Sequence, residues 1–159
     1  TGVYGDRGGA WVDETAAVRP ATDRARRRVD AERQVRAFAC RHGVRVTVLR
    51  APGIWALDRA GGDPRERVRR GEPVLAAADD VVVNHVHADD LARACVLALV
   101  RGPSPRVVNA VDDDPRPVGE RADAIADALG LPRPPRIDRA TAAATLAPAR
   151  LSFLGESRR

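Results

Sequence analysis

Two arginines one helical turn apart, Arg24 and Arg28, are the side chains of this chain whose spacing most suggests chemistry. Residues four apart on a helix share one face, so both guanidinium groups would meet the same ligand. A planar guanidinium can hold ribose or phosphate oxygens with a fixed fork of donors. It stays protonated at neutral pH and is therefore a poor proton shuttle. The pair is expected either to face a ligand or to form part of a solvated basic surface.

The element that must carry these arginines is predicted as an amphipathic helix from Thr22 or Asp23 to about Arg41. Thr and Asp are good N-caps, and Ala, Arg and Glu are good helix formers. Neither glycine nor proline interrupts the segment before Gly43. Its apolar residues fall roughly on one face, at Val29, Val35, Phe38 and Ala39.

Length and composition indicate one domain whose core is built from Leu, Val, Ile and Ala, because aromatics make up only 3% of the 159 residues and Met is absent. The formal net charge is +5, yet all 27 basic residues are arginine and they are interspersed with 22 acids. No aromatic residues alternate with a basic stripe for base stacking. The sequence therefore disfavours nucleic-acid binding, which is kept as the least favoured of three function classes.

The sequence contains no apolar run of the roughly 18–20 residues that span a bilayer, and its start does not resemble a signal peptide. We therefore expect a cytoplasmic protein without membrane contact. Cys40 and Cys95 each fall on the apolar face of a predicted helix. In a reducing compartment they are expected to be buried free thiols rather than a disulfide, and no metal-ligand spacing surrounds them.

Glycines punctuate residues 1–21, which are predicted as loop. The spacing Gly2-x-x-Gly5-x-x-Gly8 formally matches a dinucleotide-binding loop. Such a loop works between a strand and a helix N-terminus, where backbone N–H groups meet a pyrophosphate. Neither element is predicted beside these glycines, so we interpret the spacing as accidental.

Strands and helices alternate along the remainder, which predicts an α/β protein with a mainly parallel sheet. Strands are predicted at 44–50, 81–83 and 106–111, and helices at 63–70, 87–100 and 118–129. Residues 51–55 are predicted as the loop at the carboxyl end of a strand, where open parallel sheets bind ligands. A weak Ala-rich helix and an apolar stub follow, and Phe153 and Leu154 of this stub are expected to cover the core.

Several residues in these elements have a structural and a functional interpretation. His87, at the start of a predicted helix, is expected to pack or to cap rather than to act as acid or base. Asp89 or Asp90 is expected to cap the same helix. Trp55 fits either the core or the wall of a substrate cleft, and His85 has no evident partner.

Six stretches stand in an order and spacing that resemble one protein family. They are Thr1-Gly2-Val3-Tyr4-Gly5, the predicted helix at 23–41, and the segments 48–54, 84–92, 108–113 and 153–159. Together they resemble the extended short-chain dehydrogenases/reductases, which form the NAD-dependent epimerase/dehydratase family, and particularly its atypical members. The resemblance covers nearly the whole chain.

The resemblance implies an α/β fold that is the C-terminal part of a Rossmann-like parallel sheet with the smaller substrate-binding region. Residues 1–159 would form a single partial domain, in which 1–50 end the Rossmann-like part and 51–159 supply the substrate side and the remaining sheet elements. The N-terminal dinucleotide-binding half is expected to be absent, and the family's catalytic Ser or Thr would precede Thr1. The remaining strands would expose an unpaired edge and an apolar face, which favours aggregation.

In this family a Tyr-x-x-x-Lys pair lies on the helix after that first segment, where the tyrosine is general acid/base and the lysine lowers its pKa and holds the cofactor ribose. The resemblance places Arg24 at the tyrosine position and Arg28 at the lysine position. It implies NAD or NADP as cofactor, with Arg28, Pro52, Gly53 and Ile54 as its binding residues. The implied substrate is a nucleotide-sugar or another small carbonyl or hydroxyl compound, and a homodimer is compatible with the family.

Because Arg24 cannot replace the tyrosine, the leading hypothesis is a fragment of an epimerase/dehydratase-like oxidoreductase without turnover of its own. The competing hypothesis is a non-catalytic binding or sensor module. Such a module would keep a dinucleotide as a structural or regulatory ligand, with Arg24 and Arg28 on its phosphates or ribose.

Overall fold

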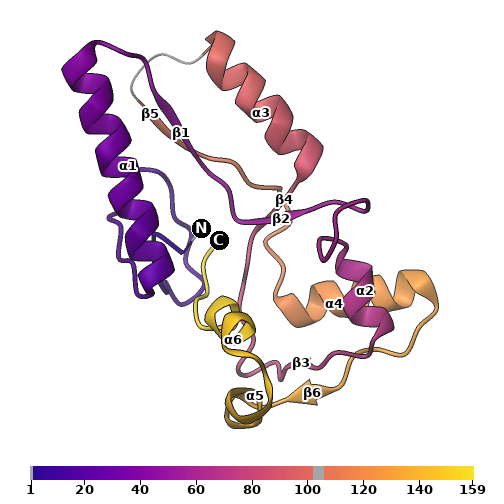
Figure 1. Ribbon diagram of the computed structural model, residues 1–159. Helices are drawn as coiled ribbons and strands as arrows, with labels where there is room; N and C mark the ends of the chain where they lie inside the picture. The colour runs from indigo at the N-terminus through magenta and orange to yellow at the C-terminus, as the bar shows by residue number, and fades with distance from the viewer. Residues whose placement is uncertain (1, 102–105) are drawn as a thin grey trace.

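The computed structural model describes residues 2–101 and 106–159, and Figure 1 shows helices arranged around short pairs of strands. In chain order the elements are α1 (Asp23–His42), β1 (Thr47–Arg50), β2 (Gly53–Trp55), α2 (Pro64–Arg69), β3 (Val74–Leu75), β4 (His85–His87), α3 (Ala88–Arg101), β5 (Arg106–Asn109), α4 (Val118–Leu129), β6 (Arg136–Ile137), α5 (Arg139–Thr145) and α6 (Pro148–Leu154).

The strands pair in parallel, and each pair joins segments that lie far apart in the sequence. β1 pairs with β5, β2 with β4, and β3 with β6. The prediction of an α/β chain with parallel pairing is therefore confirmed. Among the described residues the pairs remain separate two-stranded ladders, and α1 and α3 flank the β1–β5 pair (Figure 1).

The strand predicted at 81–83 is not formed, and this prediction is wrong. Its backbone makes only an isolated antiparallel bridge between Val82 and Pro117. The N–H of Val82 donates to Ser157 Oγ, and its carbonyl accepts from the N–H of Arg158. The C-terminal tail therefore takes the hydrogen bonds that a neighbouring strand would have made.

Strand β2 occupies residues predicted as loop, and β4 was not predicted, its last residue His87 having been predicted as the start of a helix. The two errors have one cause, because each segment is extended only by pairing with the other. The alternation His85-Val86-His87 is a period-two signal, but three residues are too few to separate a strand from a helix start. β3 and β6, of two residues each, were not predicted for the same reason.

The helices follow the sequence prediction closely because local caps fix their ends. α1 begins after Thr22, whose Oγ1 accepts a hydrogen bond from the N–H of Ala25 at 3.2 Å. It ends at Gly43, which takes the left-handed φ of 64° that glycine adopts without strain. α4 spans the predicted residues and ends at Gly130 with φ of 63°.

The prediction that both cysteines are buried is wrong, since Cys40 and Cys95 are exposed free thiols. The reason is that the two helices carrying them are sparsely covered. Phe38 of α1 is 54% exposed, and α3 contains no buried residue.

The buried apolar residues form two clusters. One lies among β3, α5, α6 and the segment before β4, and consists of Leu75, Val81, Ala142 and Leu154. The other joins the N-terminal loop to α1 and consists of Val3, Tyr4 and Val29. Leu154 covers the core as predicted, whereas Phe153 is half-exposed.

A buried polar network ties the second cluster to the strands. The side chain of Arg50, at the end of β1, is only 6% exposed and donates to the Glu32 carboxylate of α1 at 2.8 Å. Arg50 also donates to the Tyr4 hydroxyl at 2.7 Å, and that hydroxyl donates to Asn109 Oδ1 of β5 at 2.8 Å. These bonds fix the N-terminal loop and α1 against the β1–β5 pair.

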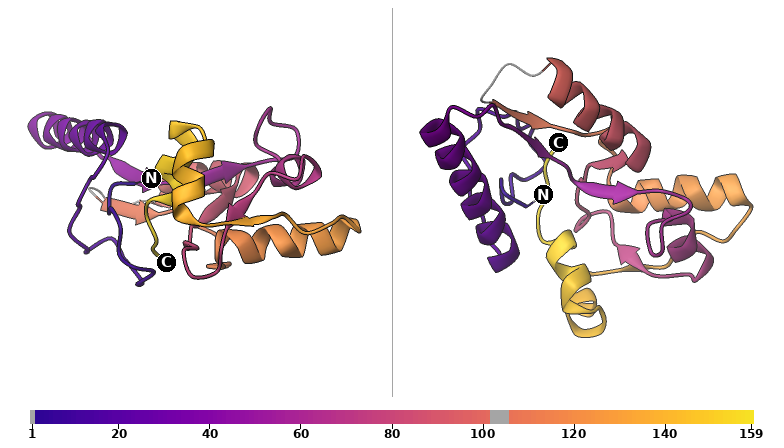
Figure 2. Two further views of the ribbon diagram at one scale, coloured as in Figure 1. Left: turned by 90° about the horizontal axis from the view of Figure 1, so that it is seen from below. Right: turned by 45° about the horizontal axis from the view of Figure 1, so that its top comes forward.

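The two ends of the described chain lie side by side (Figures 1 and 2). The N–H groups of Arg7 and Gly9 donate to the carbonyl of Ser157 at 2.9 and 3.0 Å. Ala10 and Arg159 are also bonded through their main chains, at 2.9 Å. The tail after α6 is thus held by backbone hydrogen bonds to the N-terminal loop.

An apolar surface is open on α3 and beside β1, as expected from the resemblance. Leu99 and Val100 of α3 are 82% and 71% exposed. A groove of about 520 Å³ between β1 and α3 includes Leu49 and Leu99 in its lining. Within the described residues β1 pairs on one edge only. None of the helices in the described part of the chain is long and apolar enough to cross a membrane.

The double substitution Leu99→Lys with Val100→Lys is expected to raise the solubility limit and to reduce the binding of a hydrophobic dye, because it breaks an exposed apolar surface. Precipitation thresholds and dye fluorescence measure the two effects. Ala143→Lys with Ala144→Lys, at exposed positions of α5, adds the same charge elsewhere and serves as the control. Equal effects of the two double variants would show that net charge rather than the apolar surface limits solubility.

Arg50→Ala is expected to lower the free energy of unfolding by about 3 kcal/mol, because it leaves the largely covered Glu32 carboxylate without its donor. Tyr4→Phe removes one hydroxyl from the same network and is expected to cost about 1–2 kcal/mol. Urea unfolding measures both values. Arg26→Ala breaks an exposed ion pair with Asp23 and should cost less than about 1 kcal/mol. A loss for Arg50→Ala no larger than for this control would contradict the assigned role of the network.

Candidate functional site

Arg24 and Arg28 lie on α1 as predicted, but the observed contact of Arg24 leads to the C-terminal helix. The guanidinium carbon of Arg24 lies 4.4 Å from the centroid of the Phe153 ring in α6. This distance is typical of a cation–π interaction, so Arg24 links α1 to α6. Arg28 is exposed one turn further along α1. Their placement at the cofactor or proton-transfer positions of the family stays a prediction.

The segment Pro52-Gly53-Ile54, predicted to line the cofactor, runs from the end of β1 into β2. Pro52 and Gly53 are half-buried, and Ile54 is 36% exposed. A Cβ atom on Gly53 would lie 2.9 Å from Cδ2 of His85, closer than real Cβ contacts. Glycine here therefore lets the His85 ring lie directly against the backbone of β2. The assignment of these residues to a cofactor stays a prediction.

The structure brings Trp55, whose role the sequence left undecided, against His87. They are register partners at the carboxyl ends of β2 and β4, and their ring centroids lie 4.6 Å apart at an interplanar angle of 73°. This is an edge-to-face contact. Trp55 is half-buried, and 28% of the His87 side chain is exposed. The two rings therefore lie at the carboxyl ends of β2 and β4, and the carboxyl ends of parallel strands commonly carry ligand-binding groups.

His87 caps α3, which confirms the expectation that it packs or caps. The N–H of Asp89 donates to His87 Nδ1 at 3.3 Å. Asp89 and Asp90 lie inside the first turn of the helix, where their negative charges are attracted to the positive end of the helix dipole. The expectation that either aspartate is the N-cap is therefore wrong, because β4 ends at His87 and leaves the cap position to the histidine.

His85 is the other histidine on this side of β4, and it is held neutral. Burial, together with the charge of Arg121, lowers the pKa of His85 from 6.5 to about 4, although Asp112 opposes the shift. Within the described structure the Nδ1 atom of His85 and the Nε atom of Arg121 are buried without a hydrogen-bond partner. Arg121 reaches Asp112 at 3.5 Å through its other nitrogens. The imidazole is thus a largely covered neutral group against the Gly53 backbone.

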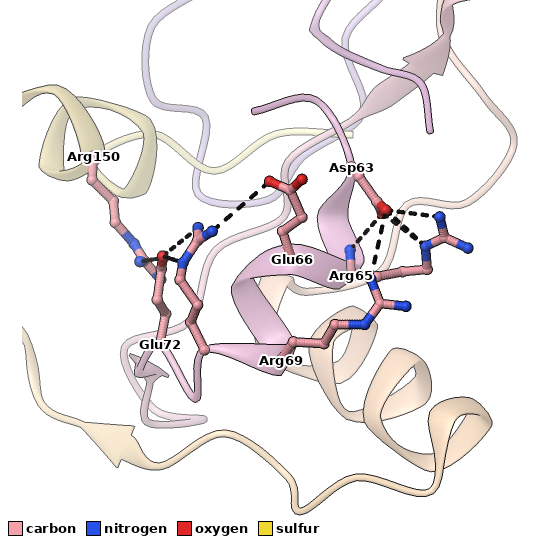
Figure 3. A network of polar contacts seen from close by, with 7 residues as sticks. Asp63, Arg65, Glu66, Arg69, Glu72 and Arg150 are labelled. Carbon is pink, nitrogen blue, oxygen red and sulfur yellow. Dashed lines mark hydrogen bonds and ion pairs between the residues drawn. The ribbon is translucent and has the colours of Figure 1, made fainter. Parts of the chain in front are cut away.

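Helix α2, which follows this region in the chain, has several arginines that pair with carboxylates (Figure 3). Asp63 accepts from Arg65 at 2.8 Å and lies 4.0 Å from Arg69, and the Arg65 hydrogen bond lowers the pKa of Asp63. Glu72 pairs with Arg70 at 2.7 Å and with Arg150 of α6. Burial would raise the pKa of Glu72, but these two arginines lower it. The guanidinium groups drawn in Figure 3 are therefore already occupied by carboxylates.

Arg59, in the loop between β2 and α2, differs from these arginines. Its NH1 group donates to the carbonyl of Ile54 at 2.7 Å, which folds the side chain back along β2. A Cβ atom on Gly62 would lie 2.9–3.0 Å from the Arg59 side-chain carbons, so glycine makes room for this stem. No ion pair of Arg59 with a carboxylate is found in the part of the chain that the structure describes. Its printed contact is thus with the backbone of β2 rather than with a carboxylate.

The described residues include no group of three or more His, Cys, Asp or Glu side chains that could hold a metal ion. Sequence reasoning did not single out Arg59, because only the folded loop places it against β2.

The free energy of unfolding is expected to fall as the pH drops from about 6.5 to 4. In this range His85 becomes protonated in the unfolded chain, whereas its lowered pKa keeps it neutral in the folded chain. The full contribution is on the order of 3 kcal/mol, present above pH 6.5 and lost once the pH is below the folded-state pKa. Urea unfolding at a series of pH values measures it. His85→Phe should remove this part of the pH dependence, whereas His42→Gln, at an exposed residue of α1, should keep it. Identical profiles for wild type and His85→Phe would contradict the assignment.

Comparison with known proteins shows which solved structures have a similar fold. No protein-family model matches the sequence, and no curated protein sequence matches it. Among solved structures, the chain is similar to a conserved protein of unknown function from Silicibacter pomeroyi DSS, with 34% identity, a TM-score of 0.84 and coverage of 100% of this chain and 54% of that one. It is also similar to MoeE5 in complex with UDP-glucose and NAD, with 27% identity, a TM-score of 0.71 and coverage of 86% and 48%.

A third similar structure is the UDP-glucose 4-epimerase of Thermus thermophilus in complex with NAD, with 22% identity, a TM-score of 0.69 and coverage of 86% and 47%. The chain thus spans about half the length of the solved structures it matches. These structural neighbours include NAD-dependent epimerases and dehydratases that act on nucleotide-sugars. The chain shares the Rossmann-like α/β fold of NAD-dependent nucleotide-sugar epimerases and dehydratases.

Proposed function

We propose that these residues form the substrate-side part of an NAD(P)-dependent epimerase- or dehydratase-like protein, that they bind a nucleotide-sugar, and that by themselves they catalyse no hydride transfer. The observation that carries the proposal is the fold similarity, which extends over 86% of the chain in a neighbour holding both UDP-glucose and NAD. Parallel strands support a ligand site at their carboxyl ends, where β2 and β4 present Trp55 and His87.

The proposed lack of turnover rests on α1. Arg24 would stand where the family has its tyrosine, and a guanidinium does not exchange protons at neutral pH. Its contact with Phe153 further supports a packing role at that position. The sequence contains no lysine that could assist a proton donor, and Tyr4 is buried with its hydroxyl bonded to Arg50 and Asn109.

A second candidate function is a module that binds a dinucleotide without catalysis. It is favoured by the exposed position of Arg28, one turn after Arg24, from which a planar fork of donors could hold a ribose or phosphate. In this case Pro52, Gly53 and Ile54 would line the nicotinamide side of the ligand.

Calorimetry with UDP-glucose and with NAD or NADP, combined with the absorbance of the reduced nicotinamide, tests the proposal. We expect saturable binding of UDP-glucose and no change in nicotinamide absorbance with either cofactor. Oxidation or reduction of the cofactor by the purified chain would refute the lack of turnover. Absence of UDP-glucose binding would refute the substrate-side assignment.

The second candidate predicts that Arg28→Ala weakens NADP binding at least fivefold, because it removes a charged ligand to ribose or phosphate. Arg33→Ala, at another exposed position of α1, is the matched control. Equal NADP affinities of the two variants, measured by calorimetry, would reject Arg28 as a ligand.

A further inference from the structure

Glycines of the N-terminal loop shape it around the tail that follows α6. Gly8 and Gly9 adopt φ angles of 57° and 80°, in the left-handed region that favours glycine. The N–H groups of Arg7 and Gly9 converge on one acceptor, the carbonyl oxygen of Ser157, at 2.9 and 3.0 Å. Main-chain N–H groups that converge in this way form a nest, a concavity that holds an electronegative atom. In this chain the atom belongs to the tail.

Ser157 is the residue at which three segments meet. Its N–H donates to Asp6 Oδ1 at 2.9 Å, and its Oγ accepts from the N–H of Val82 at 3.0 Å. The N–H of Arg158 then donates to the carbonyl of Val82 at 3.1 Å. Val82 belongs to the segment 81–83, which lies shortly before β4. The tail therefore joins the N-terminal loop to the approach to β4.

Arg158 and Arg159 extend the contact along the loop. Nη1 of Arg158 donates to the carbonyl of Gly5 at 3.1 Å. The N–H of Arg159 donates to the carbonyl of Ala10, and its own carbonyl accepts from the N–H of Val12, both at 2.9 Å. The loop is thus bonded to the tail at both of its ends, and the views in Figure 2 show the two segments running side by side.

These contacts are polar and bury little apolar surface. Among the described residues, neither apolar cluster includes a side chain from 6–11 or from 157–159. Trp11, the largest side chain of the loop, is 73% exposed. A segment that is held by hydrogen bonds and has few buried apolar contacts opens locally at a lower free energy than the core. The loop and the tail can therefore separate while both clusters stay packed.

We propose that residues 157–159 form a clasp that closes the loop 6–12 onto the segment 81–83, and that these three segments open together while α1 and the β1–β5 pair stay folded. The clasp is a conformational device, because it couples the order of the N-terminal loop to that of the chain entering β4. It does not depend on the proposed function, since all its contacts lie within the chain.

Amide hydrogen exchange of the unmodified chain, resolved to single residues and repeated at urea concentrations below the unfolding transition, tests the clasp without any substitution. The amides of Gly9, Val82 and Arg159 are expected to share one opening equilibrium and one urea dependence. They should exchange about tenfold or more faster than the amide of Val29, a buried residue of α1. If the amide of Val82 follows Val29 instead of Gly9, the three segments do not open together and the clasp is refuted.

Asp6→Ala removes the acceptor of the Ser157 N–H, a bond that also lowers the pKa of Asp6. It is expected to speed exchange of the Val82 amide about tenfold, although the bond of that amide is to Ser157 and not to Asp6. Asp13→Ala is the matched control. Asp13 accepts from the N–H of Thr15 in the same loop, and this bond does not involve the tail. Equal acceleration by the two variants would contradict the clasp.

Gly8→Ala strains the nest, because alanine rarely adopts the φ of 57°. Gly61→Ala imposes a comparable strain in another loop, at a φ of 67°, and at both positions an added Cβ would meet no atom within 4 Å. Exchange of the Val82 amide should speed up about tenfold in Gly8→Ala and stay unchanged, relative to Val29, in Gly61→Ala. If Val82 and Val29 accelerate equally in Gly8→Ala, the loop opens only by global unfolding and the clasp is wrong.

Discussion

The arrangement of the described chain depends on a buried guanidinium, that of Arg50. A buried charge is costly unless it is paired and hydrogen-bonded, and Arg50 meets this condition through Glu32 of α1 and the hydroxyl of Tyr4. The Tyr4 hydroxyl in turn donates a hydrogen bond to Asn109 of β5, which ties that strand to the same network. Because β2 begins three residues after Arg50, the network that fixes the end of β1 also fixes where the site-bearing strand starts.

Apart from histidine, arginine is the only type of basic residue in the sequence. The role of each arginine depends on the groups that surround it rather than on how many arginines the chain has. Arg65 and Arg70 pair with Asp63 and Glu72, so they stabilise the segment between β2 and β3 and offer little charge to a ligand. Arg24 lies on an aromatic ring, and Arg59 lies on a backbone carbonyl. The net charge of +5 is therefore spread over groups with distinct structural tasks.

The parallel pairing of β2 with β4 places the proposed site. Parallel strands end at the same edge, so Trp55 and His87 meet there although 32 positions of sequence separate them. The same pairing puts the neutral, buried His85 beneath the backbone of Gly53. The fold is shared with NAD-dependent epimerases and dehydratases, and the chain covers about half of the neighbour solved with UDP-glucose and NAD.

The sequence by itself determined the helices and the α/β class. Thr22, Gly43 and Gly130 fix helix ends through caps that involve only neighbouring residues, so α1 and α4 could be predicted to within a residue or two. The order of its motifs also led to the epimerase/dehydratase fold. Of the candidate site, the sequence located the segment at 52–54 but did not decide the role of Trp55 and did not single out Arg59.

Only the tertiary structure decided the short strands, the exposure of the two cysteines and the contact of Trp55 with His87. β2, β3, β4 and β6 contain two or three residues each, and a partner distant in the chain makes them strands. The segment 81–83 has the composition of a strand but bonds to the C-terminal tail instead. Local sequence encodes caps and periodicity, whereas pairing, burial and the position of a folded-back arginine depend on contacts between remote segments.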